Sequence, residues 1–157
     1  MFKVIILTIL ISLYSNFVSA KGQLSGSWSC SITTETELPS KMDTSFLFIV
    51  DKDETRFTRR GHIVVPTGIS EIPKIELKTV EAGSLFVDGV NMKVVPNNVS
   101  LEVVKGKEIF GAAAVEEFKK HLLSEEVGVI INQAKDSFEF TVEEGRQTNH
   151  CVREVKA

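Results

Sequence analysis

Apolar and polar residues alternate along most of the chain from residue 24 onward. Trp28, Cys30 and Ile32 alternate with small polar residues, and this period of two is typical of a β-strand with one buried face. Residues 46–50 form an unbroken apolar run instead, which predicts a buried strand. The same signals predict strands over residues 24–33, 44–50, 55–65, 75–80, 84–87, 90–95, 99–103, 127–131, 138–142 and 147–155. We therefore expect a mainly β fold.

Turn residues separate these segments. Asp88-Gly89 lies between two apolar runs and predicts a hairpin, because the central positions of such turns need positive φ. Pro96-Asn97-Asn98 predicts a second turn, Glu144-Gly145 a third, and Pro39-Ser40 a loop. Gly61 lies inside a strand pattern and marks a candidate bulge.

The hydrophobic period changes only once, between residues 107 and 124. At 100° per residue, one stripe of this segment is apolar and the opposite face is charged. The stripe consists of Phe110, Ala114, Val115, Phe118 and Leu122, and the charged face of Glu116, Lys119 and Lys120. Glu116 and Lys120 have the four-residue spacing of a helical ion pair. We expect one amphipathic helix that packs on the sheet, rather than on a membrane or a partner, followed by the last strands.

The two ends of the chain can pair as antiparallel strands. Trp28 and Cys30 are two residues apart, as are Cys151 and Arg153, so one register sets Cys30 opposite Cys151 and Trp28 opposite Arg153. Such pairing closes the sheet into a barrel and removes its exposed edges. With only two cysteines in the chain, we expect one disulfide, and two buried free thiols are the alternative. Arg153 is predicted to form a cation–π contact with Trp28, or else to be an exposed terminal charge.

Residues 1–20 have the pattern of a cleavable secretory signal peptide. A short basic start precedes an apolar run over residues 4–14, and Val18-Ser19-Ala20 provides small residues for cleavage. The run is shorter than the roughly 20 apolar residues of a membrane span. A lipoprotein signal would place a cysteine directly after the cleavage site, where this chain has Lys21. We expect export to the periplasm or the extracellular space, with residues 21–157 forming a single soluble β-barrel domain.

The charge of the chain argues against a nucleic-acid partner. The formal net charge is −3, and it becomes −4 once Lys3 leaves with the signal peptide. Binding to phosphates requires a basic face instead. The two dibasic pairs, Arg59-Arg60 and Lys119-Lys120, are expected to be solvated surface.

Short motifs at both ends resemble those of known barrel proteins. Leu24-Ser25-Gly26-Ser27-Trp28 resembles the Gly-x-Trp opening of lipocalins, whose tryptophan packs beneath an arginine from late in the chain. The whole chain is more similar to a group of small exported proteins of Gram-negative bacteria. These open with Gly-x-Trp-x-Cys and end with Cys-x-Arg, as residues 26–30 and 151–153 do here. The resemblance implies an antiparallel, lipocalin-like β-barrel of about eight strands, with one amphipathic helix before the last strands, and it carries no binding residues across. In lipocalins the helix follows the barrel instead.

Signatures of catalysis and metal binding are missing from the sequence. It has no Gly-x-Ser-x-Gly elbow, His-Glu-x-x-His helix, phosphate-binding glycine-rich loop or Cys-x-x-Cys pair. Asp51, Asp53 and Glu54 match a calcium loop only in part, because the turn glycine is missing, and a solvated hairpin is preferred. The histidines lie in separate segments without ligand spacing: His62, His121 and His150. We therefore expect neither enzyme activity nor a cofactor nor a metal.

The preferred functional hypothesis is a non-catalytic binding module for a small apolar or lipid-like ligand, such as a fatty acid. A barrel of about eight strands either encloses one small ligand or fills itself with side chains. A cavity of roughly a few hundred Å³ with a polar rim would favour ligand binding, and a filled core would favour surface recognition. The candidate interior residues are Phe46, Phe48, Phe57, Phe138 and Phe140. The alternative is an envelope protein–protein interaction module such as a hydrolase inhibitor, although the inhibitory motif Ser-Gly-x-x-Tyr is missing. An enzyme with an unfamiliar site is a third possibility.

Overall fold

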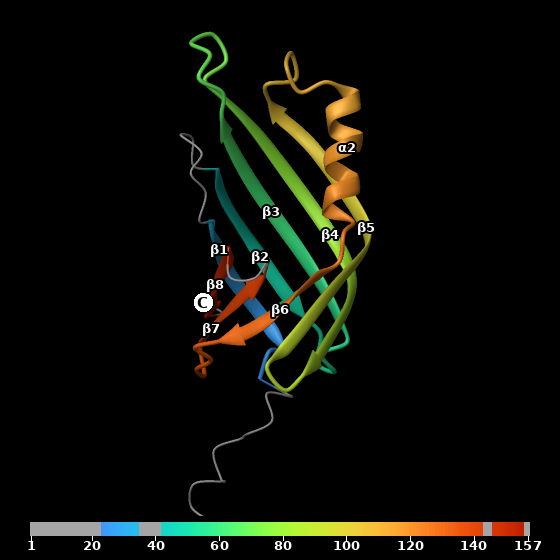
Figure 1. Ribbon diagram of the computed structural model, residues 1–157, viewed down its shortest axis with the longest axis vertical. Coiled ribbons are helices and arrows are strands. Elements are labelled where there is room, and N and C mark those ends of the chain that lie inside the picture. The colour runs from blue at the N-terminus through green and yellow to red at the C-terminus, as the bar shows by residue number, and fades with distance from the viewer. Residues whose placement is uncertain (1–22, 35–41, 143–145, 156–157) are drawn as a thin grey trace, which may run out of the picture.

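Eight antiparallel strands form a closed barrel in which every strand pairs with its neighbours in sequence and the first pairs with the last (Figure 1). The computed structural model describes residues 23–34, 42–142 and 146–155. The predicted signal peptide, the loop at Pro39-Ser40 and the turn at Glu144-Gly145 lie outside these residues. The elements are β1 Gly26–Thr34, β2 Asp43–Val50, β3 Arg56–Pro66, β4 Lys74–Asp88, β5 Asn91–Lys105, α2 Ala112–Leu122, β6 Glu126–Ile131, β7 Ser137–Val142 and β8 Gln147–Arg153. The predicted mainly β barrel with one helix before the last strands is confirmed.

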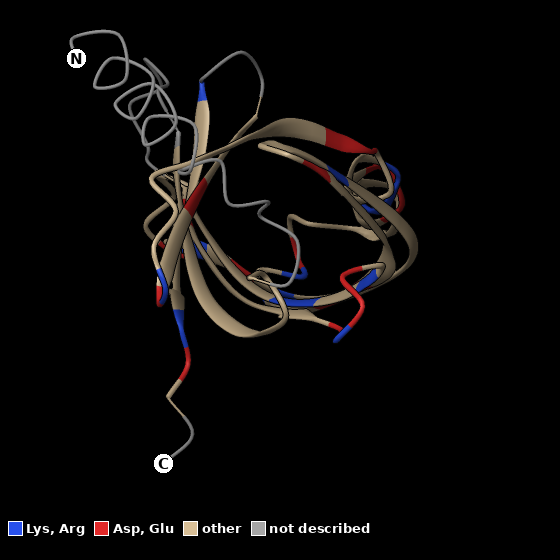
Figure 2. Cartoon of the chain, turned by 90° about the horizontal axis from the view of Figure 1, so that it is seen from below, with Lys and Arg blue, Asp and Glu red and all other residues tan. Residues whose placement is uncertain are grey.

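Pairing of β1 with β8 closes the barrel in the predicted register. Trp28 lies opposite Arg153, and Cys30 lies opposite Cys151. The two cysteines form a disulfide, with their Cα atoms 4.1 Å apart. Seen from below, the strands follow one another around a ring (Figure 2).

The long strands β4 and β5 differ from the prediction, which divided each of them in two. The predicted hairpin is present, but its two turn residues are Gly89 and Val90, because Asp88 pairs with Asn91 as the last residue of β4. Only Gly89 of the predicted turn pair has positive φ, at 60°. The predicted turn at Pro96–Asn98 is wrong: Ala82 pairs with Asn98 and Gly83 with Pro96, so the register shifts and the chain continues as a bulged strand. Gly61, predicted as a bulge, instead lies in regular register with its neighbours on β2 and β4.

The interior has two hydrophobic cores, a large one in the lower part of the barrel and a small one beside α2 in the upper part. The lower part, around Trp28 and the disulfide, is a filled core to which most strands contribute. The upper part lies where β3, β4 and β5 extend beyond the other strands. There β5 loses its second neighbour, because β6 pairs only with residues 91–94 of β5. Helix α2 packs along this part of the sheet.

Helix α2 uses the predicted apolar stripe but is shorter than predicted. It begins at Ala112, because residues 107–110 form turns, in which the Phe110 amide donates a hydrogen bond to the Gly106 carbonyl. The helix packs on the sheet as predicted: Val115 and Phe118 of α2, together with Phe110 just before it, contact a small core of Ile63, Leu77 and Val103. No side chain of α2 is fully buried.

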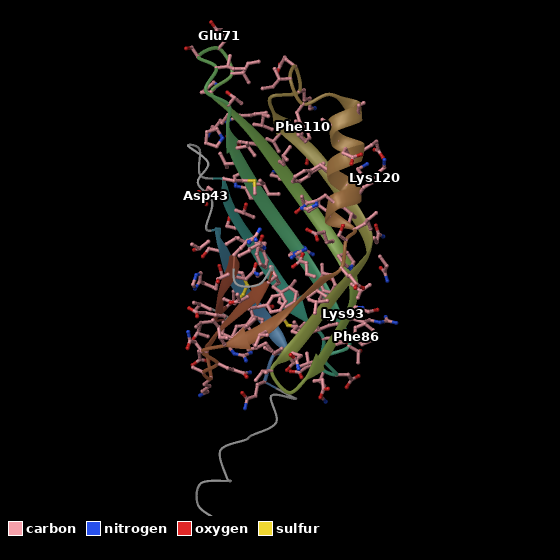
Figure 3. All side chains as sticks on the ribbon, viewed as in Figure 1. Asp43, Glu71, Phe86, Lys93, Phe110 and Lys120 are labelled. Carbon is pink, nitrogen blue, oxygen red and sulfur yellow. A yellow bond between two sulfur atoms is a disulfide. The ribbon has the colours of Figure 1, made fainter. Side chains whose placement is uncertain are left out.

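The charged face of α2 points away from the strands, as Lys120 shows in Figure 3. Its ion pairs have three-residue spacing, Glu116 with Lys119 at 3.0 Å and Glu117 with Lys120 at 3.3 Å. The predicted pair of Glu116 with Lys120 is therefore replaced by two neighbouring pairs.

Candidate ligand-binding cavity

A cavity of about 440 Å³ occupies the upper part of the barrel. Inward-facing residues of β1 to β4 form most of its wall, and the C-terminal end of α2 with residues 124–126 forms the side where β5 and β6 separate. Its apolar lining includes Ile32, Phe46, Ile63, Phe118, Leu122 and Val142. Apolar side chains from elements distant in sequence therefore form much of the wall of the cavity.

A buried ion cluster separates this cavity from the filled core below. The Arg59 guanidinium donates to the Glu81 carboxylate through Nε at 3.1 Å and Nη2 at 2.5 Å. It also donates to Glu126 through Nη1 at 3.2 Å and Nη2 at 2.6 Å. Arg59 and Glu126 line both the large cavity and a void of about 10 Å³ beneath it. The three charged side chains thus form the polar floor of the cavity.

The charges of the floor stabilise one another. Burial lowers the pKa of the Arg59 guanidinium, but the carboxylates of Glu126 and Glu81 more than offset this and hold that pKa above its ordinary value. Burial raises the pKa of Glu81, and the attraction of Arg59 opposes that shift only in part. Arg59 also lies over the Phe46 ring, 5.5 Å from its centroid. The guanidinium is held on two sides and over a ring, as expected for a fixed structural cation.

Two threonines add polar groups to the wall. Thr79 lines the cavity, and its hydroxyl opposes the rise in the pKa of the Glu81 carboxyl. Thr44 also lines the cavity, and its buried hydroxyl has no hydrogen-bond partner among the described residues. Residues 124–126 complete the polar part, where Glu125 pairs with Lys93 at 2.7 Å.

Only one of the five predicted interior phenylalanines lines the large cavity. Phe46 does so, whereas Phe48, Phe138 and Phe140 surround the small void in the filled core. Phe57 packs in that core against Phe48, with ring centroids 5.7 Å apart. The barrel is therefore both filled and hollow, at different heights.

The residues of the polar floor were missed at the sequence level. The pair Arg59-Arg60 was expected to be solvated, which is correct for Arg60 and wrong for Arg59, whose exposed fraction is 8%. The signal available was strand alternation, because Arg59 shares the inward face of β3 with Phe57 and Ile63. Charged residues are almost never fully buried unless paired, and the partners Glu81 and Glu126 lie far along the chain.

The predicted pair at the lower end of the barrel is confirmed. The Arg153 guanidinium lies 4.0 Å from the centroid of the Trp28 ring. It also donates hydrogen bonds to the carbonyls of Ser25 at 2.9 Å and Gln23 at 3.0 Å. This end of the barrel is thereby covered, and the cavity lies at the other end.

The remaining candidate groups have structural roles. The Asp51 carboxylate accepts hydrogen bonds from the amides of Thr55 and Arg56, as expected for a hairpin turn. Glu54 is not solvated as predicted: its buried carboxylate accepts the amides of Leu24 and Ser25.

The described residues include no cluster of three metal-ligating side chains. The histidines do not converge: they lie on three elements, His62 on β3, His121 on α2 and His150 on β8. Within the described parts of the chain, no helix is long and apolar enough to span a membrane.

No model of a known protein family matches the chain, and no curated protein matches it.

Proposed function

We propose that the protein is an exported, non-catalytic binding module that holds one small, mostly apolar ligand in the upper cavity of its barrel. The observation that carries this proposal is the cavity of about 440 Å³ with apolar walls and a polar floor. Sites for small molecules have volumes of roughly 300–1,000 Å³, with mostly apolar linings and a few placed polar groups.

The distribution of filled and hollow regions supports binding over surface recognition. The lower core, the disulfide and the Arg153 contact stabilise the barrel without the cavity. Filling the upper part with larger side chains would bury more apolar surface and add stability. The chain leaves this space open beside the ion cluster instead, as expected for a site that another molecule fills. The buried disulfide also supports an oxidising compartment, as expected for an exported protein.

The proposal is tested with an uncharged fluorescent probe, N-phenyl-1-naphthylamine, and with native mass spectrometry of protein purified from its own compartment. We expect the probe to bind at one site per chain with a rise in fluorescence. We also expect the purified protein to carry a small molecule in part of the population.

A matched pair of variants locates the site. Thr44→Phe places a ring in the cavity and should abolish probe binding, whereas Ser45→Phe adds the same ring to the exposed outer face of β2 and should leave binding unchanged. Unfolding curves check that both variants fold. Wild-type protein that binds no probe and is uniformly free of ligand would contradict the proposal, as would equal binding by both variants.

A further inference from the structure

The guanidinium at the floor of the cavity has almost no capacity left for an anion. Arg has five N–H donors, and four hydrogen bonds from Arg59 go to Glu81 and Glu126. Both carboxylates are within ion-pair distance, at 2.5 Å and 2.6 Å. A buried arginine would ordinarily suggest a site for a carboxylate or phosphate. Here the chain itself supplies the anions.

The floor carries no surplus positive charge as long as one of its two carboxyl groups is ionised. One guanidinium faces two carboxylates, so the cluster carries one surplus negative charge when both are ionised. If Glu81 is protonated, the cluster is neutral. Glu125, a further acidic group of the wall, is already balanced by Lys93. A ligand carboxylate would thus meet no unbalanced cation at the floor, and the remaining basic residue of the lining is His121, on the α2 side of the wall.

Glu126 is the group that a ligand can reach. Its side chain is 24% exposed, against 3% for that of Glu81. Each Glu126 oxygen accepts one hydrogen bond from Arg59. A carboxylate offers about four lone-pair positions, so acceptor sites remain on Glu126. The accessible polar group of the floor is therefore an acceptor with negative charge.

We propose, on the basis of the binding function proposed above, that this cavity selects apolar ligands that carry an amine and discriminates against free carboxylates such as fatty acids. The apolar chain lies against Phe46, Ile63 and Phe118, and the ammonium group donates to Glu126. Arg59 positions the carboxylate and does not itself contact the ligand charge.

The test is competition against N-phenyl-1-naphthylamine at neutral pH by three ligands of equal chain length: decylamine, decanol and decanoate. We expect decylamine to displace the probe at a concentration at least about tenfold lower than decanoate, with decanol between them. Equal or better displacement by decanoate would overturn the inference and leave the binding function intact. A wild-type protein that binds no probe would overturn the binding function itself.

A variant pair assigns the selectivity to one side chain. Glu126→Gln should retain probe binding and lose most of the preference for decylamine. Glu117→Gln makes the same change on the exposed face of α2 and should keep the preference. Probe binding reports that Glu126→Gln is folded, and an unchanged preference in that variant would overturn the role of Glu126. If Glu126→Gln does not fold, the wild-type comparison of the three ligands still decides the inference.

Discussion

Arg153 lies over Trp28 at 4.0 Å, and through this contact the last strand covers the first at the lower end of the barrel. The chain has one tryptophan, so its fluorescence reports on this contact. Arg153→Ala removes the cation–π contact and the hydrogen bonds to Ser25 and Gln23. We expect a loss of about 1–3 kcal/mol in the free energy of unfolding, measured by urea denaturation. Arg146→Ala, at an exposed position, serves as the control.

Substitution of Arg153 by lysine tests whether the positive charge or the planar shape of the guanidinium stabilises the contact with Trp28. Arg153→Lys keeps the positive charge but loses the planar fork that reaches two carbonyls. We expect its stability to lie between those of wild type and Arg153→Ala. Equal stability of all three proteins would show that the contact contributes nothing to folding.

The disulfide joins residues 121 positions apart and should contribute strongly to stability. In the chain-entropy model, a crosslink that closes a loop of this size stabilises by about 4–5 kcal/mol, less any strain. The double variant Cys30→Ala/Cys151→Ala should therefore lose about 2–5 kcal/mol in the free energy of unfolding, which appears as a lower urea midpoint. An unchanged midpoint would mean that the β1–β8 pairing alone holds the ends together.

The buried ion cluster should tolerate loss of its cation poorly. Arg59→Met leaves Glu81 and Glu126 facing each other without a counter-charge, so we expect a destabilisation of about 3–5 kcal/mol. Arg60→Met, the next residue on the exposed face of β3, should change stability by less than about 0.5 kcal/mol. Comparable effects of the two variants in thermal or urea unfolding would show that the cluster is not held as described.

The barrel could be predicted from the sequence because the patterns that indicate it either involve neighbouring residues or recur with the same spacing at both ends of the chain. Strand alternation needs only neighbouring residues, and the register of β1 and β8 follows from the equal spacing of Trp28 to Cys30 and Cys151 to Arg153. The prediction of a turn at Pro96 was wrong because a proline does not always end a strand. Proline is tolerated in a strand at an edge or a bulge, and Pro96 lies at a bulge, just beyond the last residue of β5 that pairs with β6.

Strand alternation points Arg59 inward, but the contacts of the cavity floor could not be predicted from it. Arg59, Glu81 and Glu126 come from three strands, and their contacts depend on registers that no local pattern specifies. Phenylalanines were instead expected to line the ligand site because apolar residues suit it. The structure places most of them in the filled core, where packing rather than binding determines their position.

The pKa of Glu81 should make stability depend on pH. Burial raises this pKa in the folded protein, while Arg59, Glu126 and Thr79 face the same carboxyl group. Protonated Glu81 therefore favours the folded state: this contribution is complete below the ordinary glutamate pKa and is lost as pH rises through the raised value. Glu81→Gln mimics the protonated form at every pH.

The expected result is a difference between two pH profiles. The free energy of unfolding of Glu81→Gln, relative to wild type, should rise as pH increases from acidic to neutral. Glu102→Gln, on the exposed face of β5, should run parallel to wild type. Urea denaturation at a series of pH values measures this, and a constant difference between Glu81→Gln and wild type would contradict the assigned pKa shift.

The bulge between β4 and β5 should depend on a glycine. A Cβ atom at Gly83 would meet the carbonyl oxygen of Val95 and lie 2.8 Å from the Cα of Pro96, both backbone atoms that cannot rotate away. Gly83→Ala should therefore destabilise the protein by about 1–3 kcal/mol.

Gly111→Ala provides the matched control, because a Cβ there meets no atom within 4 Å and the backbone has φ −74°. Alanine at position 111 reduces the freedom of the unfolded chain, but Gly111 is the N-cap of α2, where alanine is a poorer cap than glycine. The two effects oppose each other, so we expect a net change of less than about 0.5 kcal/mol. A clear loss of stability in Gly83→Ala, with little change in Gly111→Ala, would confirm in urea denaturation that the close approach of β5 explains the requirement for glycine at position 83. Equal losses in the two variants would contradict it.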